Sequence, residues 1–128
     1  MLYLKLKQLR HENETWKRLL GFMAEENIRL KNRLAEVLQD PFDHNLLEEL
    51  ESFQSGFVME DELIGFLLKE LVDIDGLLVK EVFENSNALL KVENKFKKMR
   101  KTMMSVETQF GALKSEFNNY LSQNISIG

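Results

Sequence analysis

The chain has 128 residues, of which 44% are hydrophobic and 30% are charged, with one proline and six glycines. This composition excludes a disordered chain and favours helices. The absence of cysteine excludes disulfides, thiolate metal sites and cysteine nucleophiles, and the net charge of −4 argues against a nucleic-acid binder.

The first predicted helix covers about residues 3–39. Apolar residues recur there at alternating spacings of three and four, and only Asn13 and Asn27 break the pattern. A lone asparagine at such a position fixes the register and the number of partners of a coiled coil. Two arrangements remain open, an antiparallel hairpin with the second helix and a parallel dimer of this segment, and charge favours the hairpin. The repeat positions are Leu2, Leu6, Leu9, Asn13, Trp16, Leu20, Met23, Asn27, Leu30, Leu34 and Val37.

The second predicted helix covers about residues 41–83. Asp40 can cap it, Pro41 suits its first turn, and Asp43 can complete a capping box, which predicts a tight reversal. Its end has two candidate turns, DIDG at 73–76 and ENSN at 84–87, and matched helix lengths favour ENSN. The repeat contains one polar member and consists of Leu46, Leu50, Phe53, Phe57, Glu60, Ile64, Leu67, Leu71, Ile74 and Leu78.

The third predicted helix covers about residues 87–124. Its repeat runs through Val82, Asn85, Leu89, Val92, Phe96, Met99, Met103, Val106, Phe110, Leu113, Phe117 and Tyr120. Together the three segments predict one all-α domain over residues 1–128, an elongated antiparallel bundle of three helices in up-down-up order.

The distribution of charge supports this order. Residues 1–40 carry a net charge of +2, residues 41–87 carry −10, and residues 88–128 carry +4. An acidic middle helix between two basic ones suits antiparallel neighbours. The predicted turns place Glu48, Glu49 and Glu51 level with Arg33, Lys31 and Arg29. They also place Glu70, Asp73 and Asp75 level with Arg100, Lys98 and Lys97.

The middle helix carries a second apolar stripe at Met59, Leu63 and Phe66. The same register places Leu19 and Phe22 of the first helix level with this stripe. A helix that is apolar on more than one face indicates a further packing partner. We therefore expect a homodimer, or binding to another helical protein, through these five residues.

The segment RHENETW at residues 10–16 holds a histidine and two carboxylates, but it does not predict a metal site. Bundle metal sites use inward-facing Glu-x-x-His pairs from several helices. The chain has two histidines, His11 and His44, and both fall outside the apolar repeat without a carboxylate three residues earlier. We expect no metal, no cofactor and no catalytic residue.

We predict a non-enzymatic interaction, scaffold or adaptor module, and two other functions stay open. One is a helical enzyme or cofactor carrier that uses Glu60 and neighbouring acids. The other is a nucleic-acid or anionic-membrane binder that uses Lys95, Lys97, Lys98, Arg100 and Lys101, residues that can equally form a solvated helix face. We expect neither nucleic acid nor a membrane as a partner, and we expect no small-molecule substrate. Without an apolar run typical of a signal peptide or a membrane span, we expect a cytoplasmic protein.

Overall fold

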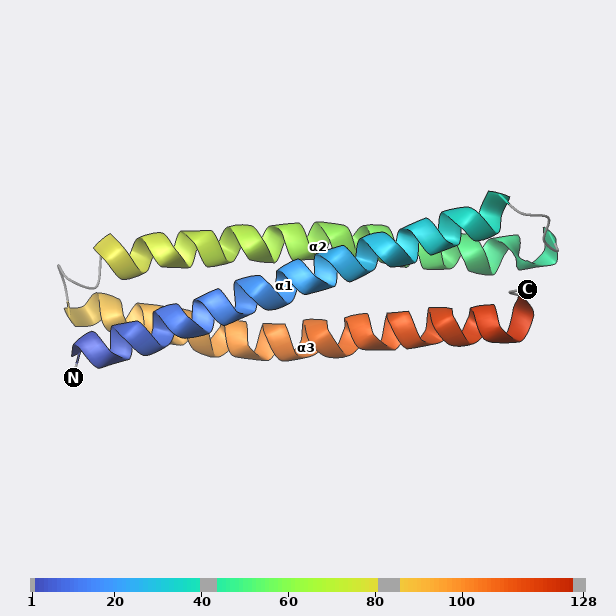
Figure 1. Ribbon diagram of the computed structural model, residues 1–128. Helices are drawn as coiled ribbons and strands as arrows, with labels where there is room; N and C mark the ends of the chain where they lie inside the picture. Colours follow the sequence, from blue (N-terminus) through green and yellow to red (C-terminus); the bar gives the residue numbers. More distant parts are fainter. Residues whose placement is uncertain (1, 40–43, 81–85, 126–128) are drawn as a thin grey trace.

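The computed structural model describes residues 2–39, 44–80 and 86–125 (Figure 1). It contains three long helices, α1 (Leu2–Gln39), α2 (Leu47–Lys80) and α3 (Ser86–Asn124), and a 3₁₀ turn, η1 (His44–Leu46), that leads into α2. The helices lie side by side in an elongated bundle, and α1 begins at the opposite end from that at which α3 ends (Figure 1). No strand occurs in the described ranges. The prediction of an all-α fold with three helices is confirmed.

The helix ends differ from expectation mainly at α2. This helix begins at Leu47 rather than at residue 41, and Asp40, Pro41 and Asp43, the residues of the predicted capping box, lie outside the described residues. The helix also continues through 73–76, so DIDG is not a turn. Ile74 and Leu78 are buried on either side of Gly76, and their burial outweighs the ~1 kcal/mol that a glycine costs in a helix. The alternative turn at 84–87 lies partly outside the described residues, and α3 already includes Ser86.

The heptad repeats correctly predict the core. Leu20, Leu50, Leu71, Leu78 and Phe96 are among the core side chains that the three helices enclose almost completely. Contacts between aromatic rings link α3 to each of the other two helices. The rings of Phe57 and Phe117 meet edge to face with centroids 5.0 Å apart, and Trp16 packs against Phe96 at 5.5 Å. Most of the stability of such a bundle comes from this apolar seam.

The predicted charge pairs between α1 and α2 were wrong. Arg29 and Arg33 bind Glu26 and Glu36 of their own helix, and Lys31 binds Asp61 rather than Glu49. The late start of α2 explains the shift, because each residue of α1 then meets a position several residues further along α2.

The pairs predicted between α2 and α3 were also wrong, and in two of the three pairs one member binds α1 instead. Arg100 pairs with Glu12, and Asp75 pairs with Lys17. Lysine and arginine side chains can reach across a groove in several directions, so their partners depend on the third helix as well as on the register.

Candidate protein-interaction surface

Asn13 of α1 is fully buried and forms hydrogen bonds to the C-terminal part of α2. Its Nδ2 donates to the backbone oxygen of Leu71 at 3.0 Å and to the carboxylate of Asp75. Lys17, one turn further along α1, binds the second oxygen of the same carboxylate. The hydrogen bond that Lys17 donates to Asp75 raises the pKa of Lys17. One carboxylate thus joins a buried amide to a half-buried ammonium.

Asn27 repeats this arrangement fourteen residues later. Its Nδ2 donates to the backbone oxygen of Phe57 at 2.8 Å and to Oδ1 of Asp61 at 2.7 Å, and Lys31 binds Oδ2. Burial alone would raise the pKa of Asp61, but the hydrogen bonds from Lys31 and Asn27 hold that pKa below its ordinary value. Both asparagines of α1 therefore bond to α2.

The third helix joins both arrangements with the same spacing. Arg100 holds Glu12 through two bonds of 2.7 Å, and Lys114 binds Glu26 at 3.0 Å, which lowers the pKa of Glu26. We call each set a polar layer. The first consists of Glu12, Asn13, Lys17, Leu71, Asp75 and Arg100, and the second of Glu26, Asn27, Lys31, Phe57, Asp61 and Lys114. Each member of the first has a counterpart fourteen residues away in the second.

Glu60 sits in the seam of α2 and is 9% exposed. Lys17, a nearby cation on α1 in the sequence register, binds Asp75 and Glu14 rather than Glu60. No described residue hydrogen-bonds its Oε2, and burial raises the pKa of its carboxyl.

The surface feature that stands out is the side of α2 that faces away from the bundle. Five large apolar side chains lie there with exposed fractions of 46–68%, and together we call them the outer α2 face. They are Val58, Met59, Phe66, Val72 and Val79. They fall at heptad spacing on two columns, which form an apolar stripe along the helix with the exposed Glu62 and Lys69 between the columns. Exposed apolar stripes of this kind mark interaction sites.

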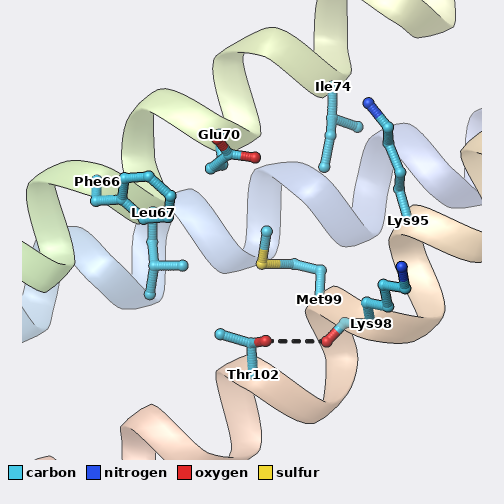
Figure 2. A pocket seen from close by; sticks show the side chains of 8 residues that line it. All are labelled: Phe66, Leu67, Glu70, Ile74, Lys95, Lys98, Met99 and Thr102. Atoms are coloured by element: carbon cyan, nitrogen blue, oxygen red, sulfur yellow. Dashed lines mark hydrogen bonds between the residues drawn. The ribbon is translucent and has the colours of Figure 1, made fainter.

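The five residues predicted to form one partner surface lie on two sides of the bundle. Phe66 lines a groove of about 250 Å³ between α2 and α3, whose floor includes Leu67 and Met99 (Figure 2). Phe22, which is 67% exposed, instead lines a groove beside Phe110 of α3. Leu19 lies with Phe22, and Met59 lies one heptad from Phe66 on α2. Leu63 is half-buried and packs against the core.

The five basic residues predicted as a possible binding patch are exposed on α3, but their contacts differ. Arg100 is held by Glu12. Lys95 and Lys98 stand at the rim of the groove in Figure 2, across from Glu70. Lys97 and Lys101 are exposed. The groove therefore has an apolar floor and a rim with both signs of charge.

The segment RHENETW lies on the surface of α1 around the buried Asn13. His11 is exposed, and the side chain of His44 is outside what the structure describes. Within the described ranges, no three histidine, aspartate or glutamate side chains gather in a way that could hold a metal ion.

None of the described helices combines the length and the apolar character that crossing a membrane requires. Comparisons of the chain with protein-family models, with curated proteins and with solved structures found no match.

Proposed function

We propose that this protein is a non-enzymatic interaction module, an antiparallel up-down-up bundle that presents the outer α2 face to a helical protein partner. The order of contacts supports the antiparallel arrangement of α1 and α2. Asn13, early in α1, bonds late in α2 at Leu71, while Asn27 bonds earlier in α2 at Phe57. The two polar layers make the bundle a rigid support for the exposed face.

The outer α2 face carries this proposal. Phe66 and Met59 are 59% and 68% exposed although the same helix buries a mainly apolar seam on its other side. Aromatic and methionine side chains are enriched at the centres of protein interfaces. A partner helix that covers the stripe would gain roughly 25 cal/mol for each Å² of apolar surface removed from water.

The test uses three versions of the chain as baits for partner proteins, including other copies of itself. We expect Phe66→Asp to lose the bound protein, because it places a charge at the centre of the apolar stripe. Met104→Asp introduces the same charge at a 71% exposed methionine on α3 and serves as the matched control. Captured proteins are identified by mass spectrometry, and circular dichroism checks that each bait is folded.

Two outcomes would contradict the proposal. One is equal capture by the native chain and the Phe66→Asp chain, and the other is equal loss with Met104→Asp. Either result would mean that the outer α2 face does not provide the contact.

A further inference from the structure

We propose that the partner of the outer α2 face is α2 of a second copy of this chain, packed antiparallel about a two-fold axis that passes between Gly65 and Phe66. This inference rests on the proposed function and names its partner. In a two-fold interface, a residue before the axis faces the residue equally far after the axis in the other copy. Residues of the outer α2 face whose numbers add up to 131 therefore face each other in this arrangement.

The charges of the face satisfy the condition. Glu62 and Lys69 are both exposed and stand equally far from the axis, on opposite sides of it. Glu62 of each copy therefore faces Lys69 of the other, and the two-fold axis forms this pair twice. Neither residue has an ion-pair partner within the described part of its own chain. Complementary charges of this kind select partner and register.

Three of the five apolar residues satisfy the same condition, Met59, Phe66 and Val72, whereas Val58 and Val79 face Asp73 and Ser52 of the second copy. The axis brings Phe66 over Gly65 of the second copy, where a Cβ would meet nothing within 4 Å. A glycine weakens the interior of a helix, and inside one chain Gly65 makes no packing contact that would require it. An approaching phenylalanine ring can use the space. Met59 faces Val72 in the same register, so two long apolar contacts flank each charge pair.

Other registers place like charges together. Moving the axis by half a heptad in one direction sets Lys69 against Lys69, and in the other direction it sets Glu62 against Glu62. Parallel pairing of the two helices opposes both like pairs at once. Like charges in direct opposition suppress wrong partners and registers. Among these arrangements, only the axis between Gly65 and Phe66 pairs Glu62 with Lys69 and brings Phe66 to the centre of the interface.

Charge exchange tests the arrangement. Glu62→Lys and Lys69→Glu should each weaken self-association about tenfold or more, because each change creates two like-charge pairs. An equimolar mixture of the two variants should recover dimers, since one chain then carries two lysines and the other two glutamates. Sedimentation over a concentration series measures the association of the 15.0 kDa chains. Glu107→Lys and Lys101→Glu, both exposed on α3, provide matched charge controls and should dimerise like the native chain.

Engineered cysteines test the register directly, because the chain has no cysteine of its own. Glu62→Cys mixed with Lys69→Cys should form a disulfide between the two variants, with little cross-linking in either alone. Self-cross-linking of Glu62→Cys would instead show parallel pairing or the antiparallel register shifted by half a heptad, and either would overturn the proposal.

Failure of this inference is distinguishable from failure of the proposed function. A native chain that stays monomeric, or a charge mixture that does not recover dimers, overturns the self-pairing. If Phe66→Asp then still abolishes capture of another protein, the outer α2 face keeps its function with a different partner.

Discussion

Replacing Asn27 with aspartate should destabilise the bundle by roughly 3 kcal/mol at neutral pH, with no change in side-chain volume. Nδ2 of Asn27 now donates to the backbone oxygen of Phe57 and to the carboxylate of Asp61. An aspartate would remove both donors and bring a second buried carboxylate within hydrogen-bond distance of Asp61. Two carboxylates that share one site cannot both remain ionised without a large penalty.

Urea unfolding followed by circular dichroism measures this change. The destabilisation should shrink as the pH falls, because protonation of the new carboxyl removes the repulsion and restores a donor. Asn32→Asp, an exposed position on the same helix, changes the net charge equally and should leave the free energy of unfolding within about 0.5 kcal/mol of the native value. Equal effects at Asn27 and Asn32 would contradict the role given to the second polar layer.

Replacing Glu60 with glutamine should stabilise the protein at neutral and alkaline pH, by roughly 1–2 kcal/mol. Burial raises the pKa of the Glu60 carboxyl in the folded chain above its ordinary value of 4.5. The fold therefore favours the protonated carboxyl, and its ionisation costs stability as the pH rises through the folded-state pKa. The native chain gains this stability back as the pH falls toward 4.5.

The difference between the native chain and Glu60→Gln isolates this single titration from all others. The free energies of unfolding should differ most above the folded-state pKa and converge as the pH falls. Glu107→Gln removes an exposed carboxylate and should give a small difference that changes little with pH. A constant difference for Glu60→Gln across the pH range would show that its carboxyl titrates normally in the fold.

The sequence predicted the core far better than it predicted the surface. Heptad spacing reports which side of a helix faces its neighbours, and the expected positions from Leu6 to Val37 are all buried. It also identified Asn13, Asn27 and Glu60 as the polar members of the seam. Spacing alone cannot report how far one helix is displaced along another, because a displaced helix presents the same repeat.

The predicted displacement depended on where α2 begins. The proline at residue 41 led us to predict that start six residues before the observed Leu47. The wrong pairs of Lys31 and Arg100 follow from it and from the third helix. Phe22 and Phe66 were likewise expected on one surface. The register predicted their positions along the bundle, but it did not predict which side of α3 each residue would face. The polar layers could have been predicted from the sequence only through the fourteen-residue spacing of Asn13 and Asn27.

The polar layers also restrict how the length of this rod can change in evolution. All three helices supply members to both layers, with α1, α2 and α3 each repeating at fourteen residues. An insertion of fourteen residues in one helix would carry its groups about 21 Å away from their partners. Matching insertions in all three helices would instead add one complete layer and leave every other contact intact. Between the layers, the rod can therefore lengthen or shorten only by matching changes in all three helices.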